Sequence, residues 1–254
     1  MPLTEEQRAS TLERFEAHRR VWDRNPALRA LYAEWYGRIA DQLPPLAIGP
    51  RVELGSGPGF ARQFIPDLEL TDLVRAPWHD RELDAEALPY GDASLGALVL
   101  FDVLHHLPSP RRFFAEAIRV LRPGGRLVMC EPYIGPLSYP VYKLLHVEPL
   151  AMRVDPLADQ GGRDTRDPFD SNQAIPTLLF GRGKAAFEVA FPALEVQRVE
   201  RLAGLSYSAS GGFSRRPILP MGFWSALHRF ESRLPAAIQR WTAFRMLIAL
   251  QRRP

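Results

Sequence analysis

The chain has 254 residues, of which 46% are hydrophobic and 24% are charged, and its formal net charge is +3. This composition suits one α/β domain with additional segments, and the single cysteine, Cys130, excludes an internal disulfide framework. No apolar run approaches the roughly 18–20 residues of a membrane span. The first residues, MPLTEEQRAS, also lack the apolar core of a secretory signal, so we expect a cytoplasmic protein.

Residues 1–45 have the pattern of two helices. Thr4-Glu-Glu-Gln7 is a capping-box sequence, and apolar residues follow it at helical spacing. Asn25-Pro26 predicts the start of a second helix, with asparagine as the N-cap and proline at the first helical position. Pro44-Pro45 ends this helical segment ahead of the main domain.

From Arg51 onward, short apolar strands alternate with helical stretches. Pro110–Leu121 is the clearest helix, and the RPGG sequence at 122–125 is typical of a helix end. Alternation of this kind predicts a parallel sheet with helices on both faces. The expected strands lie near 50–54, 68–73, 81–84, 95–101 and 125–131.

The second half of the chain departs from this alternation twice. Residues 132–190 are rich in Pro, Gly and Asp, which predicts an insertion of loops and short helices. Strand character returns at Leu194–Leu202, and a second insertion covers 203–241. The apolar segment Phe244–Gln251 predicts a closing strand.

The sequence ELGSGPGF at 53–60 follows the first strand and predicts a glycine turn that lets the backbone approach a nucleotide. A dinucleotide fingerprint would place glycine or alanine where this chain has Phe60, which disfavours a nicotinamide dehydrogenase. Pro58 removes a backbone donor that a pyrophosphate would use. Glu53 adds a carboxylate, which repels phosphate and attracts ammonium or sulfonium groups. The turn therefore favours an uncharged or zwitterionic nucleoside.

This segment resembles motif I of the class I S-adenosylmethionine-dependent methyltransferases, and further segments match that family in order over about residues 45–131. Leu70-Thr-Asp72 is similar to the end of its second strand, where an acid binds the ribose hydroxyls. Leu83–Tyr90, LDAEALPY, is similar to its adenine-binding turn. Phe101–Leu107, FDVLHHL, resembles the segment that lines the methionine end. The resemblance is clearest for the type 11 or ubiquinone-methylase-like branch.

The resemblance implies an α/β, Rossmann-like sheet of seven strands, mostly parallel with the last antiparallel. It implies a helical lid over 1–45 and a methyltransferase domain over 46–254, with acceptor-pocket insertions at about 132–190 and 203–241. S-adenosylmethionine is the implied cofactor and S-adenosylhomocysteine the product. Acids at the carboxyl ends of parallel strands suit a ribose and an adenine amine, although Asp72 and Asp84 are also typical turn formers. The implied cofactor-binding residues are Glu53, Leu54, Gly55, Ser56, Gly57, Gly59, Phe60, Asp72, Leu73, Asp84, Ala85, Phe101, Asp102 and Val103.

A general base is needed only if the methyl acceptor keeps its proton at neutral pH. We predict His106, or its neighbour His105, because histidine titrates near neutral pH; alternatively, the pair only shapes the cofactor pocket. Further candidates are His146, Glu131 and Tyr133, and the last two equally fit a strand-ending turn at Pro132. No Cys/His spacing indicates zinc and no carboxylate cluster indicates a required divalent ion, so we expect no metal.

Two features of the sequence limit the identity of the methyl acceptor: one motif is absent, and several residues are aromatic. FDVLHHLP at 101–108 lacks the Asn/Asp-Pro-Pro-aromatic motif for exocyclic amines, which disfavours DNA and favours oxygen or carbon. Tyr36, Tyr133 and Tyr139 predict an apolar pocket for a small or lipid-like molecule, although such rings also build cores. Residues 212–241 mix arginines with apolar residues, which indicates a helix that touches a membrane surface or one that covers the sheet.

Two further alternatives stay open: a protein of this fold that binds S-adenosylmethionine but catalyses a non-methylating reaction, or one that methylates RNA. RNA binding favours a continuous basic face. Acidic residues interrupt the arginines here, as in FEAHRR, WDRN and FESR. The sequence leaves the oligomeric state open.

Overall fold

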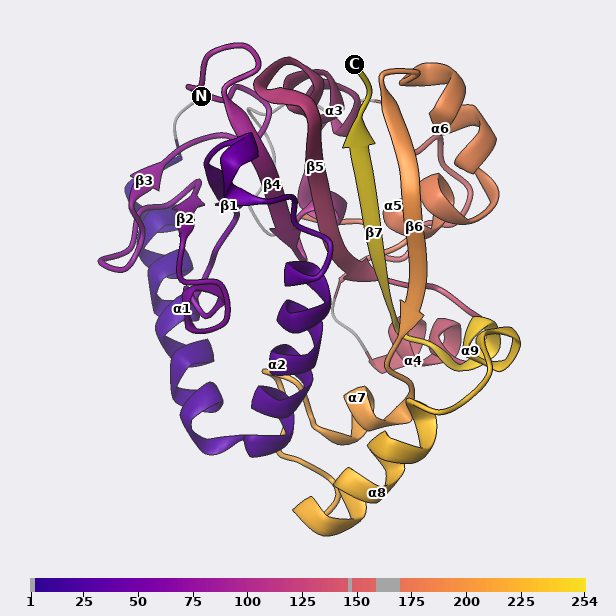
Figure 1. Cartoon of the computed structure of the whole chain (residues 1–254). Helices are drawn as coiled ribbons and strands as arrows, with labels where there is room; N and C mark the ends of the chain where they lie inside the picture. The colour runs from indigo at the N-terminus through magenta and orange to yellow at the C-terminus, as the bar shows by residue number, and fades with distance from the viewer. Residues whose placement is uncertain (1–2, 146–147, 159–169) are drawn as a thin grey trace.

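The computed structural model describes residues 3–145, 148–158 and 170–254, and its centre is one seven-stranded sheet (Figure 1). The strand order is β3-β2-β1-β4-β5-β7-β6. Neighbouring strands from β3 to β5 pair in parallel, whereas β7 is antiparallel to both β5 and β6. The predicted Rossmann-like sheet with an antiparallel last strand is therefore confirmed. The strands are β1 Arg51–Leu54, β2 Leu68–Asp72, β3 Arg81–Glu82, β4 Leu95–Phe101, β5 Leu121–Pro132, β6 Leu194–Leu202 and β7 Arg245–Arg252.

The first two helices begin where the sequence places their caps. The Thr4 hydroxyl accepts the Gln7 amide at 3.2 Å, and the Gln7 side chain accepts the Thr4 amide at 3.0 Å. Asn25 caps the next helix by accepting the Leu28 amide at 3.0 Å. Each such cap contributes about 1 kcal/mol. The described helices are α1 Glu5–Arg24, α2 Pro26–Ala40, α3 Pro110–Val120, α4 Ser138–Leu145, α5 Ile175–Thr177, α6 Lys184–Ala190, α7 Leu205–Ala209, α8 Met221–Glu231 and α9 Ala236–Thr242, with short turns η1 Leu46–Ile48, η2 Ala61–Gln63, η3 Leu104–His106 and η5 Leu178–Arg182.

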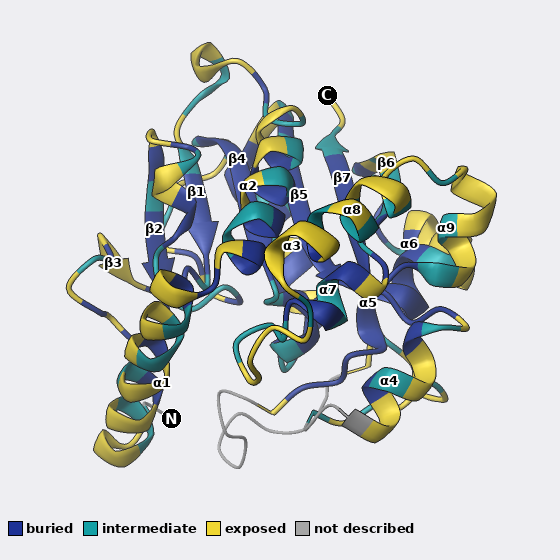
Figure 2. Cartoon of the chain, turned by 90° about the horizontal axis from the view of Figure 1, so that it is seen from below, coloured by how far each residue is buried: buried dark blue, intermediate teal, exposed yellow. Residues whose placement is uncertain are grey.

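Two hydrophobic layers cover the two faces of the sheet. Successive side chains of a strand point to opposite faces, so Leu98 and Leu100 of β4 join one layer while Val99 and Phe101 join the other. The first layer contains α3, η5 and α6, and the second contains α1, α2, α7 and α8. Figure 2 shows the strands buried between helices whose outer faces are exposed. The helices cover the faces of the sheet, and the connecting segments lie at the carboxyl ends of the strands.

β5 begins at Leu121, earlier than the expected strand near 125–131. Leu121 pairs with Leu95 and Arg126 pairs with Ala97, with an irregular register between them. The RPGG sequence fills this irregularity, because Leu121 is already extended (φ −70°, ψ 139°) where α3 ends.

The insertions carry the remaining helices. The described part of 132–190 contains α4, α5, η5 and α6, and 203–241 contains α7, α8 and α9. β6 ends at Leu202 and β7 begins at Arg245, so the α7–α9 segment lies at the carboxyl end of β6 (Figure 1). Within the described ranges, no helix is both long enough and apolar enough to cross a membrane.

Candidate active site

The glycine turn follows β1 in the chain and is hydrogen-bonded to the end of β2. Gly55, Gly57 and Gly59 all have positive φ, at 69°, 48° and 76°. The Gly57 amide donates to Asp72 Oδ2 at 2.8 Å. A Cβ added to Gly55 would lie 2.5 Å from Val103 Cγ2, so both the conformation and the space require glycine.

Side chains of this chain lie against the turn, and sequence reasoning did not single them out. Trp78 Nε1 donates to the Gly57 carbonyl at 2.8 Å, and His79 Nε2 lies 2.7 Å from the same oxygen. Arg19 of α1 donates to the Pro58 carbonyl at 2.8 Å, and its guanidinium lies 4.4 Å from the Trp78 ring centre. The N-terminal helix is thereby attached to the turn.

Two buried carboxyl groups lie beside the turn. Glu53 is fully buried, and burial raises its pKa to about 7. The Tyr36 hydroxyl donates to Glu53 Oε1 at 2.9 Å, whereas Glu53 Oε2 has no hydrogen-bond partner. Burial also raises the pKa of Asp72, although the Gly57 amide opposes this. A glycine turn next to buried carboxyls, one with an unpartnered oxygen, fits a cationic nucleoside such as S-adenosylmethionine.

The other implied cofactor residues in β1 and directly after β1 and β2 differ in their exposure and contacts. Ser56 accepts the Thr71 amide at 3.1 Å and so ties the turn to β2. Leu54 is buried in the core, and Phe60 stacks on Trp22 with ring centres 3.9 Å apart. These two side chains therefore pack the sheet. Leu73, directly after Asp72, is 41% exposed.

Asp84 and Ala85 form a turn after β3. Asp84 Oδ1 accepts the Glu86 amide at 2.8 Å, and the Ala87 amide donates to the Asp84 carbonyl at 3.0 Å. Both Asp84 and Ala85 stay partly exposed. Asp84 thus forms a turn, and because a carboxylate accepts several donors, this leaves capacity for a ligand amine.

The exit of β4 carries an ion pair between a buried arginine and a partly exposed aspartate, which the sequence did not predict. Asp102 has a left-handed backbone (φ 58°), and its Oδ1 lies 2.7 Å from Arg245 Nη2. Arg245 is 2% exposed, and its guanidinium lies 5.2 Å from the ring centres of Trp35 and Phe101. Burial lowers the pKa of Arg245, but Asp102 together with neighbouring Cys and Tyr groups outweighs burial, so the pKa is well above its usual value. The negative charge of Asp102 is therefore compensated within the protein.

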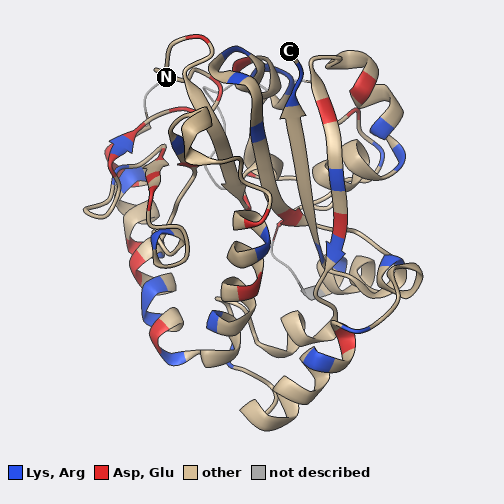
Figure 3. Ribbon diagram, viewed as in Figure 1, with Lys and Arg blue, Asp and Glu red and all other residues tan. Residues whose placement is uncertain are grey.

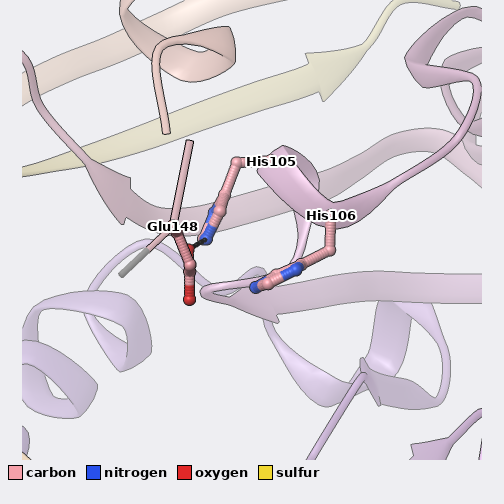
Figure 4. Close-up of side chains that lie close together, drawn as sticks. All are labelled: His105, His106 and Glu148. Carbon is pink, nitrogen blue, oxygen red and sulfur yellow. Dashed lines mark ion pairs between the residues drawn. The ribbon is translucent and has the colours of Figure 1, made fainter. Parts of the chain in front are cut away.

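Behind this pair, His105 lies between two carboxylates (Figure 4 shows the one from Glu148). His105 Nδ1 lies 2.7 Å from Glu131 Oε2, and His105 Nε2 lies 3.5 Å from Glu148 Oε2. Glu131 Oε1 accepts the amides of Val103 and Leu104 at 2.9 and 2.8 Å. Burial lowers the pKa of His105, but the two carboxylates outweigh it and raise the pKa to about 10. The His105 imidazole is therefore protonated near neutral pH and is held between the two carboxylates.

His106 is partly buried beside His105, with ring centres 4.2 Å apart. Burial, and then the charge of His105, lower the pKa of His106 to about 4. The structure thus separates the two histidines chemically, which their adjacency in the sequence does not reveal. His146, the third candidate, lies outside the described residues.

The three tyrosines expected in an acceptor pocket lie in different surroundings. Tyr36 bonds to Glu53 beside the glycine turn. The Tyr133 hydroxyl donates to the Arg240 carbonyl at 3.0 Å, within the hydrophobic layer that contains α3. Tyr139 of α4 is 39% exposed. Only Tyr36 contacts the predicted cofactor residues in the hydrogen bonds formed by the described residues.

A family profile described as "Methyltransferase domain" matches residues 52–129, which run from β1 to β5. A 27-O-demethylrifamycin SV methyltransferase of Amycolatopsis mediterranei is 48% identical over 134 residues, which cover 44% of this chain and 49% of that protein. A demethylmenaquinone methyltransferase of Renibacterium salmoninarum is 41% identical over 56 residues, 21% of this chain and 24% of that one. The chain thus spans half or less of these relatives' length.

Solved structures share the fold at low sequence identity. A putative methyltransferase in complex with the Trm112 activator of Haloferax volcanii matches with TM-score 0.55 and 16% identity over 99% of this chain and 100% of that one. Geranyl diphosphate C-methyltransferase of Streptomyces coelicolor matches with TM-score 0.50 and 15% identity over 89% and 80%. Residues 52–129 therefore form a methyltransferase domain of the class I S-adenosylmethionine-dependent family, whose cofactor is S-adenosylmethionine.

Proposed function

We propose that this protein transfers a methyl group to an oxygen or carbon of a small, apolar or lipid-like metabolite. The observation that carries the proposal is the buried Glu53 carboxyl with its unpartnered Oε2 beside the glycine turn. S-adenosylmethionine, when bound, supplies a methyl group on a positively charged sulfur that leaves with the bonding electron pair. The turn, Glu53, Asp72 and Asp84 would hold this nucleoside, together with the implied residues that directly follow β2 and β4, namely Leu73, Asp102 and Val103.

An oxygen acceptor is favoured by the two histidines at the exit of β4. An alcohol or phenol must lose its proton as its oxygen bonds to the methyl carbon. His105, whose pKa is about 10, already carries a proton near neutral pH, whereas His106, whose pKa is about 4, is neutral and can take the acceptor's proton. Glu131 orients His105, so it acts as a positioning residue. His106 is therefore the candidate base. The name of the rifamycin relative, which specifies a 27-O position, supports the same acceptor atom.

Cofactor binding is tested by calorimetry with S-adenosylhomocysteine, NAD and NADP. We expect S-adenosylhomocysteine to bind and the nicotinamide cofactors not to bind. Gly57→Val should abolish binding, because valine is strained at φ 48°. Gly91→Val is the matched control, since a Cβ at Gly91 meets nothing within 4 Å. Tighter binding of NAD, or equal affinity in Gly57→Val, would refute the assigned site.

The base is tested by following S-adenosylhomocysteine release with a set of apolar alcohols and quinols. We expect His106→Ala to slow turnover more than His105→Gln does, and both to leave cofactor affinity unchanged, because the neutral His106 takes the acceptor's proton. Intact turnover in His106→Ala would remove His106 as the base. Intact turnover in both variants would show that the acceptor loses its proton elsewhere.

We also propose that residues 212–241 contact an anionic lipid surface, from which a lipid-like acceptor would be taken. α8 buries Trp224 in the hydrophobic layer that contains α2. It therefore covers the sheet, which is one of the two alternatives that the sequence indicates. Its opposite side exposes Phe223 (72%) and Phe230 (65%), and Trp241 of α9 is 64% exposed. Exposed aromatics among arginines suit an anionic membrane. The exposed arginines are Arg215, Arg216, Arg229, Arg233 and Arg240.

Liposome co-sedimentation separates membrane contact from simple coverage of the sheet. We expect the protein to pellet with anionic vesicles and the double variant Phe223→Ser/Phe230→Ser to stay in solution. Val189→Ser is the control, because Val189 is 83% exposed on α6, outside the segment. Equal pelleting of the double variant and the unmodified protein would refute membrane contact.

A further inference from the structure

Three potential metal ligands converge beside the β4 exit (Figure 4). His105 and His106 come from η3, and Glu148 comes from the segment after α4. One ring nitrogen of each histidine and one carboxylate oxygen of Glu148 all lie within 4.8 Å of one another. His105 Nε2 and Glu148 Oε2 are 3.5 Å apart. Two ligands of one metal ion, each about 2.0–2.2 Å from it, are separated by comparable distances.

The surrounding contacts orient these donors toward each other. Glu131 holds His105 Nδ1, which directs Nε2 toward Glu148. A carboxylate on the far nitrogen is the usual partner of a metal-binding histidine. Ser171 Oγ donates to Glu148 Oε2 at 3.0 Å. Gln173 Nε2 donates to the same oxygen and lies 3.4 Å from His105 Nε2, so a bound ion would displace this amide. Both protein ligands of this pair are therefore held by further hydrogen bonds.

A second group, Asp102, His105 and Glu131, has similar spacing but is less suited to a cation. The guanidinium of Arg245 lies on Asp102 and would repel a metal ion. Glu131 already accepts two backbone amides and binds His105. The side of His105 that faces Glu148 and His106 is consequently the better site.

We infer that His105, His106 and Glu148 bind one divalent transition-metal ion. Two imidazole nitrogens and one carboxylate oxygen suit Zn²⁺, Fe²⁺ or Co²⁺ better than Mg²⁺ or Ca²⁺, which prefer oxygen ligands. The ion replaces any proton on His105 Nε2, and that proton leaves to solvent. Three protein ligands leave coordination positions open for water or another oxygen.

The open positions suggest a use that rests on the proposed function. An acceptor hydroxyl bound to the ion would lose its proton more readily, because the cation stabilises the alkoxide. His105 would then serve as a ligand, and the proton would pass to solvent or to a nearby carboxylate. Metal binding itself needs neither cofactor nor acceptor, so it can be tested separately.

The test uses the full chain after treatment with a chelator, titrated with Co²⁺ and followed by visible absorption and calorimetry. We expect one equivalent to bind, and Glu148→Gln and His106→Gln to lose most of that affinity. Glu131→Gln should weaken binding about 10- to 100-fold, because it orients His105. His228→Gln is the control: His228 lies 2.8 Å from Glu34 on another part of the surface.

Thermal unfolding shows whether each variant is folded, and Co²⁺ should raise the midpoint of the unmodified protein but not of Glu148→Gln. Absence of stoichiometric binding would overturn the inference. Equal affinity in Glu148→Gln and His106→Gln would also overturn it, because the ion would then bind elsewhere. Either result leaves the calorimetric test with S-adenosylhomocysteine unaffected, so a failed metal site and a failed methyltransferase assignment are distinguishable.

Discussion

Replacing Glu53 by glutamine should stabilise the fold and weaken cofactor binding at the same time. The Glu53 side chain is fully buried, and burial raises its pKa from 4.5 to about 7. A group with a raised pKa stabilises the protein below its unfolded value and loses that contribution as pH rises through the folded value. Above about pH 7, the protein therefore carries a buried charge that no ion pair formed by the described residues compensates.

The size of the effect follows from the pKa. Each unit corresponds to about 1.4 kcal/mol, so the shift of Glu53 amounts to roughly 3 kcal/mol. Glutamine keeps an oxygen to accept the Tyr36 hydroxyl but never ionises. We expect Glu53→Gln to be more stable than the unmodified protein by up to ~3 kcal/mol near pH 8 and to be nearly equal near pH 5.

Cofactor affinity should change in the opposite direction. The sulfonium charge of S-adenosylmethionine does not titrate, and a cation favours the ionised carboxyl. Affinity should therefore fall about tenfold for each pH unit below roughly 7 in the unmodified protein. In Glu53→Gln it should be weak and independent of pH.

Urea unfolding near pH 5 and pH 8 measures the stability. Calorimetry with S-adenosylmethionine over the same pH range measures the cofactor affinity. Glu188→Gln, on the surface of α6 with a 46% exposed side chain, is the control and should leave both quantities unchanged. A Glu53→Gln variant that is less stable near pH 8 would refute the uncompensated charge. Affinity that does not vary with pH would refute contact between Glu53 and a cationic ligand.

Three other substitutions test the site by simpler means. Arg245→Met should destabilise the fold by about 1–3 kcal/mol in urea unfolding, since it leaves the partly exposed Asp102 without its partner; no measurable loss would contradict the ion pair. Gly59→Ala should cost about 1–3 kcal/mol in the same assay, because φ is 76° and Trp78 occupies the space, whereas Gly91→Ala should change little. Asp84→Ala should weaken S-adenosylhomocysteine binding about tenfold by calorimetry, whereas Asp92→Ala, whose side chain is 81% exposed, should not.

Much of the fold was predictable because its signals are local. The capping box at Thr4 and the Asn25-Pro26 start depend on residues a few positions apart, and both helices begin where these signals stand. β4 and β7 are apolar runs that are buried on both faces, which their composition indicates. The start of β5 was misplaced because the RPGG sequence is typical of a helix end, whereas here it fills an irregularity between paired strands.

The site was only partly predictable because its decisive contacts are distant in sequence. Glu53 and Asp72 were identified from the glycine turn and the strand ends that they accompany. Arg245 reads as a surface residue by type, and only the folded sheet places it on Asp102. Trp78 and Glu148 lie in segments without periodic patterns, so nothing local indicates that they meet the turn or His105.

The distribution of buried charge over the sheet's carboxyl edge indicates where a ligand belongs. At β4 and β5, the protein supplies its own cations, since Arg245 neutralises Asp102 and His105 neutralises Glu131. At β1 and β2, Glu53 and Asp72 are buried near each other, and each raised pKa reflects a charge that burial disfavours. Elsewhere the visible charges are interspersed, with acidic and basic segments alternating along α1 and β6 (Figure 3). A cationic ligand at the glycine turn would compensate Glu53 and Asp72, for which the described residues supply no ion pair.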